Sequence, residues 1–89
     1  MLQQTTTIVN KLGLHARAAA KFVTQASLFK SEIKVKKNNL DVNGKSIMGI
    51  MMLAAAKGSE IELIIDGADE QKAMQSLLEL IANRFGEAE

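Results

Sequence analysis

Apolar residues recur along the chain at spacings that separate helices from strands. Residues 16–27 and 70–85 place apolar side chains every three or four positions, which predicts an amphipathic helix in each range. The two stripes consist of Ala19, Phe22, Val23 and Ala26 in the first helix, and Ala73, Met74, Leu77, Leu78, Ile81 and Phe85 in the second. A short apolar run after Ser46 predicts a third helix, from Ile47 to about Leu53.

The ends of these helices carry residues that favour starting and stopping. Asp69 precedes the last helix and is a good N-cap residue, while Gly86 is placed to end that helix. In the short helix, Ile47, Ile50 and Ala54 share one face. We expect that face to lie in the core.

Strands are predicted where apolar and polar residues alternate. Clear alternation covers residues 32–36, 40–43 and 60–65. A strand over residues 2–9 is a weaker prediction, which depends on threonine and the Ile8-Val9 pair and not on clean alternation. An Asn-Asn pair at 38–39 separates the first two strands. Asparagine tolerates the positive φ that a two-residue hairpin turn requires, so we expect a hairpin there.

The order of elements is β-α-β-β-α-β-α, which predicts an α+β fold. Alternating strands need one dry face, and three amphipathic helices can cover it. We therefore expect a two-layer, open-faced β-sandwich, in which a four-stranded antiparallel sheet is covered on one face by three helices. A chain of 89 residues has room for one domain, 1–89, and little core to enclose a deep substrate cavity as well. Any chemistry should therefore lie at the surface.

Charge and composition narrow the classes of function. Eleven basic and ten acidic residues give a net charge of +1, so no overall field draws the protein to nucleic acid or to a membrane. Basic residues nevertheless concentrate between positions 11 and 45, which suits an acidic protein partner or a phosphate. The chain has no cysteine, so disulfides and thiolate metal sites are excluded.

No segment of the sequence predicts export or membrane insertion. The first residues lack the basic start and the apolar run of a signal peptide. The longest apolar stretch, residues 47–56, is too short to span a bilayer and is interrupted by Gly49. We expect a soluble, cytoplasmic protein, and a monomer, because no long apolar seam is left over once the core is counted.

The stretch from Gly13 to Ala19 holds the candidate reactive group. His15, the only histidine, falls at the N-cap of the first predicted helix or just before it, and Arg17 lies in the first turn. Unpaired N–H groups at a helix start bind anions, and Arg17 can add charge-assisted hydrogen bonds to a phosphate. An imidazole, an anion hole and a guanidinium together form a workable phosphoryl acceptor.

The same residues also fit a plain structural interpretation, in which a polar side chain ends a loop. A metal site fits less well, because one histidine has no clustered ligands nearby. A Ser-His-Asp hydrolase is disfavoured, because so small a domain has little room for the pocket that this reaction needs. The residues by themselves thus leave a phosphate site and a loop-end histidine as open alternatives.

Ser46 and the methionines after it form a second candidate region. Serine is a common helix N-cap, because its hydroxyl can bond a free backbone N–H. The short helix is apolar on all sides. Met48, Met51 or Met52 can therefore either fill gaps in the core or face outward as an adaptable docking surface.

Two long segments resemble one known family. GLHARAAAKFV closely resembles the active-site signature of HPr, the histidine phosphocarrier of the bacterial phosphoenolpyruvate-dependent phosphotransferase system, and NGKSIMGIMMLAAAKGSEIEL resembles its regulatory-serine segment. Residues 66–70 match the usual entry to the last helix of that family. These matches cover essentially the whole chain, so 1–89 is identified as a single HPr-like domain. Many members carry proline where this chain has Ala18, early in a helix, where proline is well tolerated.

The resemblance implies a phosphoryl relay and not a stand-alone enzyme. His15 would accept the group on Nδ1 from phosphorylated Enzyme I and would donate it to an EIIA-type protein, of the sugar-uptake or the nitrogen-linked branch. Arg17 would orient and neutralise the phosphoryl group, and the backbone amides of Ala16 and Arg17 would hold its oxygens. No cofactor and no metal are implied.

Regulation and docking are also implied by the resemblance. The serine that matches Ser46 is phosphorylated in many members by an HPr kinase/phosphorylase. Positions that match Ile47, Met48 and Met51 contact partner proteins in the family. For this chain we therefore expect a modification site and a docking surface on the short helix.

Two other classes of function compete with the carrier. One is a regulatory binding module that docks through phosphorylated Ser46, as in relatives that lack the histidine; the presence of His15 with Arg17 favours the carrier. The other is a small RNA-binding domain. It is disfavoured, because three phenylalanines and no tyrosine or tryptophan leave no platform for stacking bases.

Overall fold

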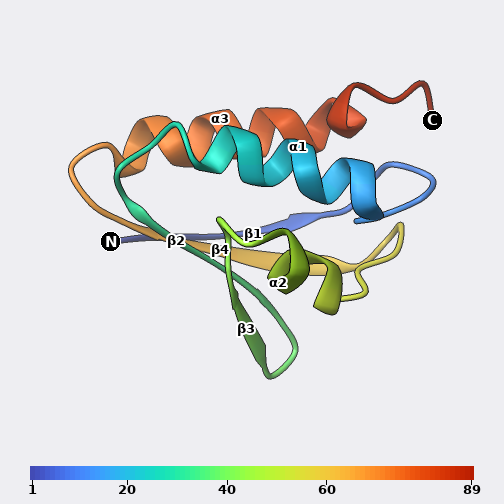
Figure 1. The fold of residues 1–89 in the computed structure, drawn as a ribbon, viewed down its shortest axis with the longest axis horizontal. Coiled ribbons are helices and arrows are strands. Elements are labelled where there is room, and N and C mark those ends of the chain that lie inside the picture. The colour runs from blue at the N-terminus through green and yellow to red at the C-terminus, as the bar shows by residue number, and fades with distance from the viewer.

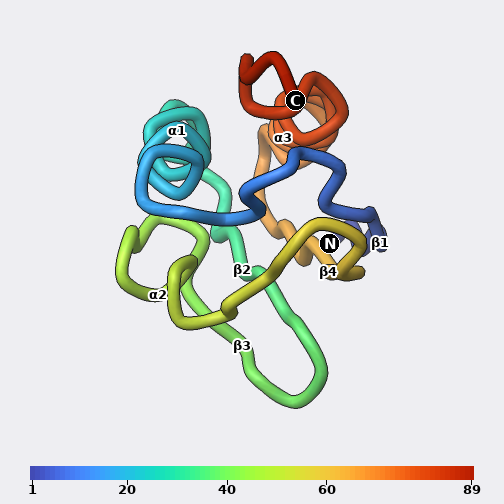
Figure 2. The backbone as a smooth tube through the Cα atoms, turned by 90° about the vertical axis from the view of Figure 1, so that its right-hand side faces the viewer, coloured from blue at the N-terminus to red at the C-terminus, as the bar shows by residue number.

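In the computed structural model, which describes residues 1–89, three α-helices lie on one face of a four-stranded antiparallel sheet (Figure 2). The elements are β1 (Leu2–Thr7), α1 (Ala16–Ala26), β2 (Glu32–Lys37), β3 (Leu40–Asn43), α2 (Ile47–Met52), β4 (Glu60–Asp66), α3 (Glu70–Ala82) and a 3₁₀ turn, η1 (Arg84–Gly86). Helices α1 and α3 pack side by side (Figure 1). The predicted α+β fold and order of elements are confirmed.

The sheet has the strand order β1-β4-β2-β3, and every neighbouring pair is antiparallel. Its central strands bury the alternating apolar residues found in the sequence. Ile33 of β2 pairs with Ile65 of β4, and Val35 pairs with Leu63; all four are buried. A slip of one residue would turn these side chains to solvent, so the alternation fixes the register.

Both ends of the sheet show how local sequence shapes the strands. At one edge, Lys37 pairs with Leu40 across the predicted two-residue turn, where Asn38 has a φ of 56°. At the other edge, β1 ends at Thr7 and not at residue 9 as predicted. The partner strand β4 begins only at Glu60, so Ile8 bonds instead to the preceding turn, donating its amide to the carbonyl of Ser59 at 2.9 Å.

The core lies between the sheet and the helices. Phe22 of α1, Ile50 of α2 and Leu77 of α3 are all fully buried in it, and burying a side chain of this size contributes about 1.5–3 kcal/mol.

The expectation that Ile47 and Ala54 of the short helix join Ile50 in the core is wrong. Helix α2 ends at Met52 and the chain turns at Ala54, which has a φ of 49°, while Ile47 faces solvent. None of the helices has the length and apolar character needed to cross a membrane.

The end of α3 departs from the prediction. The helix stops at Ala82, three residues earlier than its apolar spacing indicated, and Arg84, Phe85 and Gly86 follow with φ of 58°, 55° and 78°. Phe85 is nevertheless buried, as expected. The left-handed turn redirects the C-terminal residues toward the loop between β1 and α1, where the end of the chain makes several contacts.

The start of α3 corrects a second expectation. Asp69 occupies the N-cap position, but its φ of −105° and ψ of 25° lie outside the extended geometry that a capping side chain uses, and it makes no capping bond. Its carboxylate instead accepts hydrogen bonds from the amides of Lys30 at 2.8 Å and Ser31 at 3.0 Å, and from the Ser31 hydroxyl. Asp69 therefore joins the segment before β2 to the start of α3.

Candidate functional site

The loop between β1 and α1 carries His15 and is tied to the chain before β4. Gly13 has a φ of 67°, and a Cβ at this position would overlap the carbonyl oxygen of Ala55. Leu14 donates its amide to that same oxygen at 2.9 Å and buries its side chain. This close approach requires glycine, and it sets His15 at the start of α1.

His15 is the N-cap residue of α1, as the sequence predicted. Its backbone is extended, with a φ of −73° and a ψ of 176°, and its carbonyl accepts the first helical bond, from the amide of Ala19 at 2.8 Å. The amides of Ala16 and Arg17 therefore lie in the first turn, where no helical acceptor is available. The His15 side chain is 26% exposed, and Arg17 is exposed and forms no ion pair.

Glu87 is part of this site, and sequence reasoning missed it. One of its carboxylate oxygens, Oε2, contacts Nε2 of His15. The other oxygen, Oε1, accepts a hydrogen bond from the Asn10 side chain at 3.0 Å. This bond, more than the contact with His15, holds the pKa of Glu87 below its ordinary value against the opposing effect of burial.

Asn10 links Glu87 to the loop. Its side-chain amide also donates to the carbonyl of Gly13 at 2.8 Å, and the residue is fully buried. No local pattern reveals these contacts, because Asn10 and His15 lie 77 and 72 positions from Glu87 along the chain. The only signal available was the presence of polar residues at both ends of the sequence.

An open pocket of about 560 Å³ surrounds the histidine. Beside it, Glu89 accepts the Lys11 amide on its backbone carbonyl at 3.0 Å and pairs with the Lys11 ammonium at 3.2 Å. The pocket is lined by Lys11, Leu12, His15, Ala16, Arg17, Glu87 and Glu89. The three predicted residues of the phosphate site, 15–17, are thus brought together at the surface.

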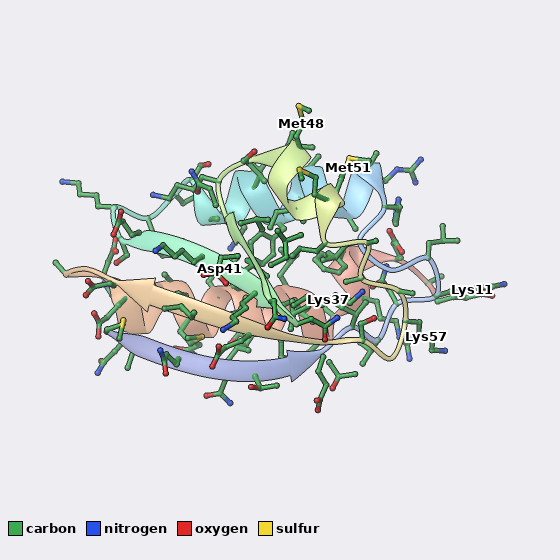
Figure 3. The ribbon with its side chains drawn as sticks, turned by 90° about the horizontal axis from the view of Figure 1, so that it is seen from below. Lys11, Lys37, Asp41, Met48, Met51 and Lys57 are labelled. Atoms are coloured by element: carbon green, nitrogen blue, oxygen red, sulfur yellow. The ribbon has the colours of Figure 1, made fainter.

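Ser46 lies at the start of a different element, α2, which carries the predicted docking residues and packs against α1. The Ser46 hydroxyl accepts the amide of Gly49 at 3.1 Å, so the predicted cap is present. Met48 is 76% exposed and projects outward from α2 (Figure 3), and Ile47 and Met51 are also exposed. Met48, Met51 and Met52 thus face outward and do not fill the core, while their role in docking stays a prediction.

The fold and the site define a small α+β protein whose one candidate reactive group, an imidazole at a helix start, lies in an open surface pocket. The neighbouring groups are backbone amides, a guanidinium and a carboxylate. No cluster of three or more His, Cys, Asp or Glu side chains with the arrangement of a metal site is present. These groups suit the binding and transfer of a small anion at the surface.

Comparison with known proteins gives the family. Residues 2–83 match the family model described as the PTS HPr component phosphorylation site. The phosphocarrier protein HPr of Neisseria meningitidis serogroup A is 64% identical to this chain over the full length of both. A crystal structure of HPr-C-His from Thermoanaerobacter tengcongensis has a TM-score of 0.96 and 49% identity, again over the full length of both chains.

The chain therefore belongs to the HPr family, the phosphocarriers of the bacterial phosphotransferase system. It is a carrier of this system and not a stand-alone catalyst. An HPr dimer from Thermoanaerobacter tengcongensis is also similar, with a TM-score of 0.79 and 50% identity over 98% of this chain and all of that one. The monomeric state expected from the sequence stays a prediction.

Proposed function

We propose that His15 accepts a phosphoryl group from phosphorylated Enzyme I and donates it to an EIIA-type protein. The Nδ1 lone pair of His15 attacks phosphorus while the donor's phosphorus–nitrogen bond breaks, and that electron pair stays on the donor. Onward transfer repeats the same exchange with His15 as the leaving group. The observation that carries this proposal is the partly exposed imidazole at the start of α1, within residues 2–83, which match the family model.

The neighbours of His15 supply the stabilisation that a phosphoryl group needs. The first-turn amides of Ala16 and Arg17 are unpaired donors at the positive end of α1, where they suit phosphate oxygens. Arg17 is exposed and free of ion pairs, so its guanidinium is available for charge-assisted hydrogen bonds to the same oxygens. Both features favour a phosphoryl group held at the surface, within reach of two successive partners.

Intact-mass analysis tests the acceptor. The protein is mixed with phosphoenolpyruvate and Enzyme I, beside a His15→Ala variant and a Ser46→Ala variant. We expect one acid-labile phosphoryl group on the parent and on Ser46→Ala, and none on His15→Ala. Absence of transfer to the folded parent, with an active Enzyme I, would overturn the proposal and would favour a regulatory module that acts through Ser46.

A second part of the proposal is regulation at Ser46 by an HPr kinase/phosphorylase. A phosphate there adds about −1.5 to −2 charges at the start of α2, next to the exposed Ile47 and Met48. The positive helix end tolerates this charge, so the fold should survive, while a partner that approaches with acidic groups is repelled. The expected effect is slower transfer with an unchanged structure.

Ser46→Asp tests this effect, because aspartate keeps the cap and adds charge. The matched control is Asn39→Asp, which adds the same charge at an exposed hairpin tip. We expect only Ser46→Asp to slow phosphorylation of His15 by Enzyme I, with thermal stability retained in both variants. Equal rates for Ser46→Asp and the parent would contradict the proposal.

A further inference from the structure

The C-terminal residues return to His15 through a turn that costs backbone strain. Arg84 and Phe85 adopt left-handed φ values of 58° and 55°, which non-glycine residues rarely do. Phe85 is buried, and its carbonyl accepts a hydrogen bond from the Lys21 ammonium at 2.7 Å. Strained turns of this kind persist where the surrounding structure holds them, and here the turn delivers Glu87 to the histidine.

The position of the Glu87 side chain is fixed by both of its oxygens. Oε1 accepts the Asn10 amide at 3.0 Å, and Oε2 contacts Nε2 of His15. Asn10 is itself held by its second bond, to the Gly13 carbonyl at 2.8 Å, and is fully buried. The Glu87 side chain is only 15% exposed, so little water competes for its oxygens.

The ionisation of Glu87 determines which ring nitrogen of His15 carries hydrogen. The hydrogen bond from Asn10 lowers the pKa of the Glu87 carboxyl, so the carboxylate is ionised at neutral pH. An ionised carboxylate only accepts hydrogen bonds. Nε2 must therefore bear the proton that faces Oε2, which in the neutral ring leaves the lone pair on Nδ1.

We propose that Glu87 is a positioning residue for phosphoryl transfer, which holds the Nε2–H of His15 and offsets the positive charge that the ring gains when Nδ1 binds phosphorus. The inference rests on the proposed acceptor role of His15. When the bond to phosphorus forms, the proton stays on Nε2 and the ring becomes a cation beside the Glu87 carboxylate. When the bond breaks, the ring leaves as neutral imidazole, so no proton has to move in either direction.

The fold does not depend on Glu87 to hold the tail in place. Two contacts hold the chain on either side of Glu87. The Lys21 ammonium binds the carbonyl of Phe85, and Lys11 binds Glu89 through a backbone hydrogen bond and an ion pair. Substitution of Glu87 should therefore remove its contacts with His15 and Asn10 and leave the course of the chain intact. This separates a positioning role from a purely structural one.

Three variants test the inference. Glu87→Ala removes both hydrogen bonds and the charge, whereas Glu87→Gln keeps the shape and one acceptor oxygen and removes the charge and the second acceptor. Glu79→Gln is the matched control, because it removes the charge of an exposed carboxylate on α3, outside the pocket that holds His15. Thermal unfolding and backbone amide spectra check that all three variants keep the fold.

Two readouts are measured on each variant. The first is the ¹H–¹⁵N signal of the His15 Nε2 proton at low temperature, which a hydrogen bond to carboxylate protects from exchange with water. The second is the kinetics of phosphorylation by Enzyme I. We expect Glu87→Ala to lose the protected signal and to lower kcat about tenfold or more with little change in KM, as for loss of a charge-assisted hydrogen bond. Glu87→Gln should lie between it and the parent, and Glu79→Gln should match the parent.

The outcomes separate the two proposals. If the parent is phosphorylated and Glu87→Ala is phosphorylated equally fast, or keeps the protected Nε2 signal, the role of Glu87 is overturned while that of His15 stands. An equally slowed Glu79→Gln variant would also overturn it, because the loss of any negative charge would then explain the effect. If the parent accepts no phosphoryl group, the acceptor role of His15 fails, and the role of Glu87 fails with it.

Discussion

At the scale of single residues, Gly13 is the position on which the placement of His15 most directly depends. Its φ of 67° favours glycine, and a Cβ would overlap the Ala55 carbonyl oxygen and lie 2.9 Å from Cα of Ala56. Both neighbours are backbone atoms, so neither can yield without moving the chain before β4. Any side chain at this position therefore shifts the loop that carries the histidine.

Gly13→Ala should accordingly destabilise the protein by about 2–5 kcal/mol, the sum of a left-handed alanine and an overpacked contact. Gly58→Ala is the matched control, because Gly58 has a φ of 90° and a methyl group added there would meet no other atom within 4 Å. It should cost only about 1–2 kcal/mol. Urea unfolding measures both values, and equal losses would show that the contact with Ala55 is unimportant.

The residues of the site divide according to how far apart they lie in the sequence. His15, Ala16 and Arg17 are neighbours in one helix start, so a local motif was enough to predict them together. Glu87 reaches His15 from 72 positions away through a left-handed turn. Neither apolar spacing nor a short motif reports a contact of that kind, and only the folded structure reveals it.

At the scale of elements, Asp69 connects the segment before β2 to the start of α3. The Ser31 hydroxyl, followed by the Lys30 amide, stabilises the ionised carboxylate and lowers the pKa of Asp69 to about 2. An unfolded aspartate titrates near pH 3.9. The folded state thus binds fewer protons than the unfolded state in this window, so the contribution of Asp69 to stability is complete above about pH 5 and is lost as the pH falls toward 2.

Asp69→Asn should therefore lower stability at pH 7 and flatten the fall in stability between about pH 5 and 2. The measurement is urea unfolding at a series of pH values. Asp41→Asn is the control, because Asp41 is exposed in β3 and takes part in no salt bridge. If the two variants show the same dependence on pH, the bonds to residues 30 and 31 do not explain the stability of the ionised carboxylate.

The elements themselves were largely predictable, for a physical reason that also explains the errors. Apolar periodicity reports which side chains are buried, and it predicted α1, α3 and three of the four strands, while a short apolar run predicted α2. It does not report backbone angles. Phe85 fits the helical spacing and is buried, yet its backbone is left-handed and the helix has already ended at Ala82. Asp69 likewise stands at the right position for a cap with the wrong dihedral angles.

At the scale of the whole molecule, the exposed apolar side chains of α2 stand out. The three helices cover one face of the sheet, but α2 buries only Ile50 and leaves Ile47, Met48, Met51 and Met52 exposed. Large apolar side chains that gather on a surface mark sites of protein–protein contact. Their position on the helix that packs against α1 favours a partner that covers α2 and reaches the start of α1.

Met48→Gln tests this surface with little risk to the fold, since the side chain is 76% exposed and its substitution should change stability by less than about 0.5 kcal/mol. We expect KM for Enzyme I to rise about fivefold or more, as for loss of a contact worth about 1 kcal/mol or more, with kcat unchanged because His15 is untouched. Leu28→Gln is the matched control, because Leu28 is 70% exposed but follows the far end of α1 from His15. A rise in KM for Met48→Gln alone would assign the docking surface to α2. An equal rise for both variants would contradict this assignment, because replacing any exposed apolar side chain would then weaken binding.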